Sequence, residues 1–515
     1  MWRARYVTVQ QLAGFRRYEY CAVDTNPLSV YVMQPIWDKI IKIVPLWIAP
    51  NVLTFSGFVM ILVNYFLISF YDWDYTASGT SPGLVPTWVW LFSAFTTLGA
   101  YTLDSIDGKH ARRTQSSTPL GELFDHGLDS WATSIFVLSF FSVCSRDNGK
   151  TGVSVYTMYL YLSIVLFNFM CSHWEKYNTG VLFLPWGYDL SQVVLIAAYL
   201  LTGAVGVEVW HKPVLFGYYI TDILVILLIG FSLFLSFPQT LYNIHRAHLK
   251  KTLKNDSLYE GLLPLVSPLL LFILLTVWVA LSPGNILAKQ PRLFLWMVGV
   301  TFSNVICRVI VCQMSGTRPP LFHWLLFPLA LVVYAAISGL LGWTEEAALA
   351  VFTAFATAAH VHYGACVSFR RPPSCHCRSK VLDHCSLGYT GSLVFHNQHW
   401  LRPSVPAPFS TFPCSLPHLS SLPYSLTEGC PHSGRSSPPT NARRKENKMR
   451  KGWAQQSAFQ SWLAECRLTG VCPHAASRQE AVALTAIFYA VTSTLLIFKY
   501  QQTFEDSHIH CKTSV

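Results

Sequence analysis

The stretch Asp104-Ser105-Ile106-Asp107-Gly108-Lys109-His110-Ala111-Arg112 stands between two long apolar runs. If the first run is helical, its two aspartates lie on one face, three residues apart. The second run places Asp125 and Asp129 four residues apart, which is again one helix face. Four carboxylates therefore converge where the two helices meet.

Carboxylates held this close repel one another and are costly to desolvate, so we expect hard divalent cations with oxygen ligands to neutralise them. We predict two ions, Mg²⁺ or Mn²⁺, because paired metals suit phosphate chemistry. In the alternative, the acids only pair with Lys109, Arg112 and Arg113. We disfavour this alternative because ionisable residues at membrane depth are functional by default.

Neighbouring residues predict the rest of a substrate site. Arg112 offers a forked donor for a phosphate oxygen, and Gly108 lets a ligand approach the backbone. Glu122 stands four residues before His126, so its carboxylate is expected to orient the imidazole at the metal edge. Asn51 opens the first spanning helix at the same membrane level and is placed to hydrogen-bond a ligand, although Pro-Asn is also an ordinary helix start.

The acids belong to a longer pattern, D-x2-D-G-x2-A-R-x8-G-x3-D-x3-D. It is matched without departure by Asp104, Asp107, Gly108, Ala111, Arg112, Gly121, Asp125 and Asp129. This pattern resembles the signature of the CDP-alcohol phosphatidyltransferase class-I family. Residues 10–365 look throughout like its eukaryotic choline/ethanolamine phosphotransferases, above all the ethanolamine-specific members, in stretches such as 116–131 and 173–180.

The resemblance implies an enzyme that transfers phosphoethanolamine from CDP-ethanolamine to diacylglycerol, giving phosphatidylethanolamine and CMP. His126 is the candidate base for the lipid hydroxyl, with Asp129 as the alternative. Choline or dual head-group specificity is the main alternative function. A catalytically impaired splice form and a transporter that uses the acids as an ion path are further alternatives. We expect membrane lipid but no nucleic acid as a partner, and a homodimer is left open.

The composition is that of a polytopic, all-α membrane protein, since 52% of the residues are hydrophobic, 14% aromatic and only 12% charged. Apolar runs predict about ten transmembrane helices near 52–70, 87–103, 123–144, 153–172, 192–210, 219–237, 261–281, 293–312, 321–342 and 347–366. Before them, 28–44 has one apolar and one polar face, which predicts an amphipathic helix lying on the membrane surface.

Lysines and arginines concentrate in alternate loops, so the N-terminus, the acidic motif and residue 366 are expected to face the cytosol. The resemblance places the protein in the endoplasmic reticulum or Golgi membrane. We also expect His173 to Asn178 and Trp186 to Asp189 to form a polar, aromatic cytosolic loop, which either lines the entrance for the alcohol or lipid acceptor or is an interfacial aromatic belt. Three regions are predicted: a cytosolic N-terminus, 1–46; the phosphotransferase membrane domain, 47–366; and a divergent, mostly disordered tail, 367–515. The apolar segment 481–498 of the tail is a candidate extra span.

Overall fold

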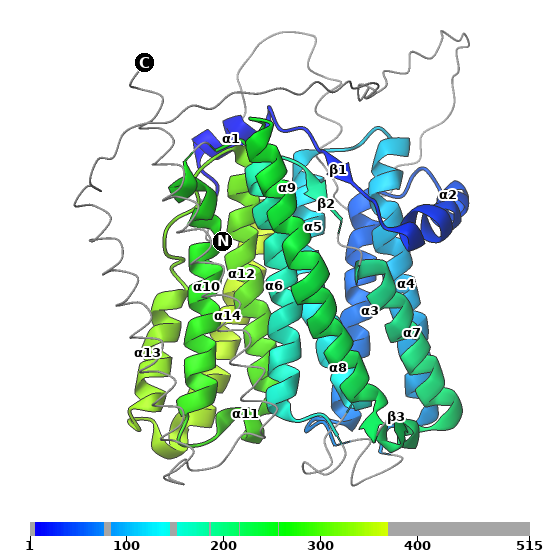
Figure 1. The fold of residues 1–515 in the computed structure, drawn as a ribbon, viewed down its shortest axis with the longest axis vertical. Helices are drawn as coiled ribbons and strands as arrows, with labels where there is room; N and C mark the ends of the chain where they lie inside the picture. The colour runs from blue at the N-terminus through cyan, green and yellow to red at the C-terminus, as the bar shows by residue number, and fades with distance from the viewer. Residues whose placement is uncertain are drawn as a thin grey trace, which may run out of the picture. The chain divides into compact units, whose positions relative to one another are not determined.

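The computed structural model describes residues 6–76, 84–144, 152–184, 187–215, 217–255 and 257–368. In these ranges the chain is almost entirely α-helical, and the long helices run side by side (Figure 1). The expected all-α fold is therefore confirmed. Nearly all of the tail 367–515, including 481–498, lies outside the described residues.

The ten predicted apolar runs correspond to ten helical segments. They are α3 Pro50–Tyr71, α4 Thr87–Arg113, α5 Pro119–Cys144, α6 Val155–Thr179, α7 Gly187–Val205, α8 Ile220–Phe231 with η3 Ser232–Ser236 and α9 Phe237–Leu249, α10 Leu258–Leu281, α12 Pro291–Ser315, α13 Leu326–Ile337 and α14 Glu345–Ser368. Eight segments in the described part of the chain are long and apolar enough to cross a membrane, which is typical of a multi-pass protein. The eight do not include α4, which ends in the charged motif, or α13, which has only 12 residues. The count of ten is thus not confirmed.

Short elements connect and cap the bundle. They are α1 Val9–Phe15, β1 Ala22–Val23, η1 Ser29–Met33, α2 Gln34–Ile43, β2 Leu182–Phe183, η2 Val207–His211, β3 Pro213–Leu215, β4 Tyr218–Tyr219, α11 Ile286–Lys289 and η4 Gly342–Thr344. Strand β1 pairs in parallel with β2, and β3 pairs antiparallel with β4. The β1–β2 pair joins the N-terminal segment to the chain just after α6, at the end of the bundle that also carries α1 (Figure 1).

Helix α12 is the core of the bundle. Nearly all of its side chains are buried, because α5, α6, α10 and α14 pack around it. A second group is formed by α3, α4 and α7, and α3 joins it to α5. This packing brings the C-terminal turns of α4 and the N-terminal turns of α5, which carry the acidic motif, to the same end of the bundle.

The expected amphipathic helix is present as η1 and α2. One face packs on α4, where the Trp37 ring meets Tyr101 edge-on at 5.2 Å. The opposite face leaves Tyr31 and Ile43 about four-fifths exposed (79% and 82%). An ordinary buried helix would not expose such side chains, so the pattern agrees with a helix that lies at a membrane surface.

Candidate active site

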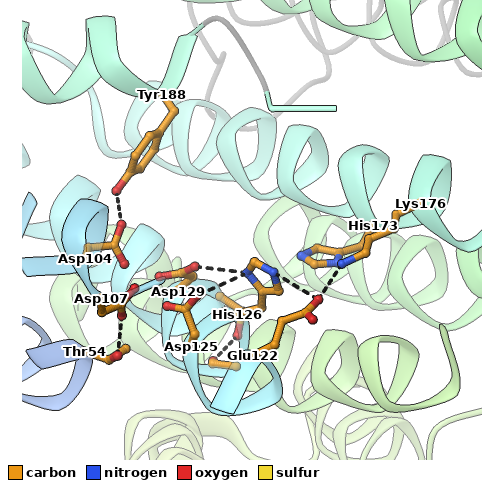
Figure 2. Close-up of polar contacts among 12 residues, drawn as sticks. Thr54, Asp104, Asp107, Glu122, Asp125, His126, Asp129, His173, Lys176 and Tyr188 are labelled. Atoms are coloured by element: carbon orange, nitrogen blue, oxygen red, sulfur yellow. Dashed lines mark hydrogen bonds and ion pairs between the residues drawn. The ribbon is translucent and has the colours of Figure 1, made fainter. Parts of the chain in front are cut away.

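The four motif aspartates face one another across the α4–α5 junction (Figure 2). Carboxylate oxygens of Asp104, Asp107 and Asp125 all lie within 4.8 Å of one another. A second group with the same spacing joins Asp125 and Asp129 to a ring nitrogen of His126. The two groups share Asp125, so the helix packing brings together all four carboxylates that the motif predicted.

This donor set suits divalent metal. The first group offers only carboxylate oxygens, which hard cations prefer. Oδ1 of Asp125 is buried and has no hydrogen-bond partner in the described part of the chain, although buried polar atoms are normally paired. A bound cation would satisfy that oxygen and offset the repulsion within the cluster.

Two hydroxyl groups donate hydrogen bonds to Asp107 and Asp104, and neither contact was predicted from the sequence. The Thr54 hydroxyl, in α3, donates to Oδ2 of Asp107. The Tyr188 hydroxyl, in the first turn of α7, donates to Oδ2 of Asp104 at 2.6 Å. Partners of this kind fix the direction of metal-binding carboxylates. Helices on both sides of α4 therefore orient its acids.

The imidazole of His126 lies between two sets of carboxylates. Its Nδ1 is 3.5 Å from Oδ2 of Asp129 and 3.9 Å from Oδ2 of Asp125, while its Nε2 is 3.6 Å from Oε1 of Glu122. These separations are longer than hydrogen bonds, and the buried Nε2 has no hydrogen-bond partner among the described residues. The ring thus presents Nδ1 to the aspartates of the cluster and Nε2 to Glu122.

The hydrogen bonds of Glu122 are made with Lys176 and Tyr18 rather than with His126. Its Oε1 accepts one hydrogen bond from Nζ of Lys176 at 2.7 Å and another from the hydroxyl of Tyr18 at 2.6 Å. Burial, together with the negative charge of Glu122, raises the pKa of Tyr18, so the phenol stays protonated and donates. The lysine is held by the rings of Tyr18 and Tyr20, whose centroids are 5.7 and 5.0 Å from Nζ.

The expectation of a loop is wrong at 187–189, which begin α7, and also at His173 to Asn178. These residues are the last turns of α6, and all six are buried. His173 packs edge-on against His126 with ring centroids 5.7 Å apart, and Lys176 reaches Glu122 one turn further along (Figure 2). Polar residues at a run's end resemble a loop in sequence, but here they continue the helix because their partners are inside the protein.

The predicted substrate-binding residues lie at the edge of the acidic cluster. Asn51 is in the first turn of α3, and its side-chain oxygen is so near Gly121 that a Cβ there would be 3.4 Å away. At Gly108 the nearest neighbour of a Cβ would be Nη1 of Arg112, at 3.7 Å. Arg112 itself is exposed. A side chain at Gly121 would therefore crowd Asn51, and one at Gly108 would touch Arg112.

Comparison with known proteins places these features in a family. A family model described as CDP-alcohol phosphatidyltransferase matches residues 47–232. The chain is 52% identical to human ethanolaminephosphotransferase 1 over 359 residues, which is 70% of this chain and 90% of that protein. It is 29% identical to Arabidopsis thaliana choline/ethanolaminephosphotransferase 1 over 325 residues, 60% of this chain and 79% of that protein. The chain belongs to the CDP-alcohol phosphatidyltransferase family.

Proposed function

We propose that this chain transfers phosphoethanolamine from CDP-ethanolamine to the free hydroxyl of diacylglycerol, releasing CMP. The observation that carries the proposal is the four-carboxylate cluster at the α4–α5 junction with an imidazole beside it. The human relative's name, at 52% identity over 90% of its length, supports ethanolamine as the head group. Choline, alone or in addition, is the alternative, because relatives at 29% identity are named for both alcohols.

In the proposed reaction the lipid oxygen forms a new bond to the phosphorus that carries ethanolamine. The bond from that phosphorus to the oxygen shared with the cytidine phosphate breaks, and CMP leaves with the electron pair. Two ions, Mg²⁺ or Mn²⁺, held by Asp104, Asp107, Asp125 and Asp129, would offset the charge on the diphosphate and the leaving CMP. Asn51, Gly108 and Arg112 line the nucleotide side of this cluster in the proposal.

The proton of the lipid hydroxyl must go to a base. We assign His126 to this role because its imidazole lies against the acidic cluster, with Nδ1 3.5 Å from Oδ2 of Asp129, while Glu122 stands beside its other nitrogen. Glu122 keeps the charge near the imidazole balanced as the proton is taken. Asp129 is the second candidate base, but in the proposal its carboxylate is already committed to metal.

The distribution of charged residues supports an orientation of the protein in the membrane. The acidic cluster lies at the end of the bundle where Arg112, Arg113 and the other motif cations gather, and the positive-inside rule puts that end in the cytosol. Soluble CDP-ethanolamine would reach the site from there, while diacylglycerol would come from the membrane. The proposed location is the endoplasmic reticulum or Golgi membrane.

The test uses the purified full-length chain in lipid nanodiscs with diacylglycerol and Mg²⁺ or Mn²⁺. CDP-ethanolamine and CDP-choline are supplied separately, and the lipid product and CMP are measured. We expect phosphatidylethanolamine as the main product and loss of activity in excess EDTA. Preferential use of CDP-choline would reassign the head group. Full turnover in EDTA, or in Asp107→Asn or Asp125→Asn protein that is still inserted, would contradict the two-metal site.

A further inference from the structure

We infer that Lys176 and Tyr18 are positioning residues for this reaction, which hold the Glu122 carboxylate beside His126 and make the N-terminal segment part of the site. The inference rests on the proposed function. It starts from one oxygen, Oε1 of Glu122, which accepts from Lys176 at 2.7 Å and from Tyr18 at 2.6 Å. The three side chains come from α5, α6 and the segment before β1, so one carboxylate joins three separate parts of the chain.

The lysine has little freedom to leave this arrangement. Its side chain is only 1% exposed, and a buried ammonium group is costly unless it is paired. Glu122 supplies the opposite charge, and the ring of Tyr20 covers the ammonium at 5.0 Å. Any rotamer that takes Glu122 away from Lys176 leaves a buried charge unpaired, so the ion pair fixes where the carboxylate lies.

The N-terminal segment is held in place on both sides of the tyrosines. Before them, α1 packs so closely on α12 that any side chain at Gly14 would collide with the backbone of Ser315. After them, β1 pairs with β2, with the amide of Leu182 bonded to the carbonyl oxygen of Cys21. Tyr18 and Tyr20 lie between these two attachments. Tyr18 therefore reaches Glu122 from an anchored backbone rather than from a loose terminus.

This arrangement has a consequence for the imidazole. Glu122 is the carboxylate nearest to Nε2 of His126, and the two groups are 3.6 Å apart with only one helical turn between them. If Lys176 or Tyr18 no longer held Glu122, that distance would vary and His126 would spend less time oriented toward the acceptor hydroxyl. A small loss of orientation in a reacting group is costly in rate but need not affect nucleotide binding, because Asn51, Gly108 and Arg112, which are proposed to bind the nucleotide, are unchanged.

The experiment measures kcat and KM for CDP-ethanolamine in nanodiscs. Tyr18→Phe removes only the hydroxyl that donates to Glu122, and we expect kcat to fall about 10-fold with KM within about two-fold. Lys176→Met should lower kcat about 10²-fold, and Lys176→Arg should recover part of it because the charge and a hydrogen bond to Glu122 return. Tyr31→Phe and Lys250→Met are matched controls, since both side chains are exposed and lie outside the site; each should keep normal kinetics.

A double variant shows whether Lys176 acts by positioning Glu122 or contributes to the reaction independently of Glu122. If Lys176 acts through the carboxylate, Glu122→Ala with Lys176→Met should be no slower than Glu122→Ala alone. A raised KM with unchanged kcat, or additive losses in the double variant, would overturn the inference. If Lys176→Met does not fold, Tyr18→Phe decides the question. No transfer by the unchanged chain would instead reject the proposed function.

Discussion

The phenolic oxygen of Tyr188 lies 2.6 Å from Oδ2 of Asp104, although the two residues are 84 positions apart. The contact ties the first turn of α7 to a carboxylate of the acidic cluster. Tyr101 makes a second tie one residue further along α7, because its hydroxyl donates to Asp189 at 2.5 Å. The entry of α7 is thus coupled to the orientation of the site's acids.

Tyr188→Phe should therefore weaken metal binding while the fold is kept. Loss of a partner that orients a metal-binding carboxylate typically costs about 10–100-fold in metal affinity or activity. The measurement is the Mn²⁺ concentration that gives half-maximal turnover. Tyr259→Phe is the control, because Tyr259 is 62% exposed in the first turn of α10. An unchanged Mn²⁺ requirement in Tyr188→Phe would contradict the coupling.

The second prediction concerns stability at the other end of α12. Arg292 is fully buried and donates to the carbonyl oxygen of Trp73 and to the hydroxyls of Ser69 and Ser142 at 2.8–3.1 Å. The ring of Tyr75 covers its guanidinium, with the centroid 3.9 Å from Cζ. Arg292→Met should destabilise the protein by about 3–5 kcal/mol, because it leaves buried acceptors unsatisfied. Thermal unfolding in detergent should show a clearly lower Tm.

The matched control for that change is Arg318→Met. Arg318 pairs with Glu260, but its side chain is 70% exposed. Exposed ion pairs contribute at most about 1 kcal/mol, so Tm should hardly move. Equal Tm values for the two variants would show that Arg292 does not clamp the helix ends as its contacts indicate.

The sequence predicted what depends on local spacing. Asp104 and Asp107, and Asp125 and Asp129, are separated by one helical turn, so a helix alone places each pair on one face. The apolar runs predicted the helices for the same reason. The predicted end of α7 was less accurate. The apolar run was expected to reach residue 210, but the helix ends at Val205 because Gly206 adopts a φ of +92°.

The sequence could not predict contacts that depend on how helices pack. Tyr18 and Lys176 lie 104 and 54 positions from Glu122, and no local periodicity joins them. Lys176 in particular was read as a loop cation, because a charged residue beside an apolar run usually faces water. Its burial becomes understandable only when Glu122 and the two tyrosines are seen around it. Partners far apart in the chain thus complete a site whose acids were evident from spacing.

The third prediction concerns the tail. Every residue assigned to the proposed reaction or to positioning its groups precedes residue 190, and the helices that pack around α12 lie within the residues described up to 368. A chain ending at Arg371 should therefore retain its turnover when compared at equal amounts of inserted protein. The comparison needs a size-exclusion profile to confirm that the shortened chain is folded. Complete loss of turnover in a well-folded shortened chain would show that the tail belongs to the enzyme.

The last prediction identifies the base. His126→Ala removes the imidazole that lies between Glu122 and Asp129 but leaves Asn51 and Arg112 in place. Turnover should fall on the order of 10²–10⁴, as is usual when a general base is lost, while CMP still binds in a calorimetric titration. His245→Ala, at an exposed position on α9, should behave normally. If His126→Ala keeps near-normal turnover, the proton goes to another group, and Asp129 becomes the better candidate because it is the next carboxylate beside the position that His126 occupies.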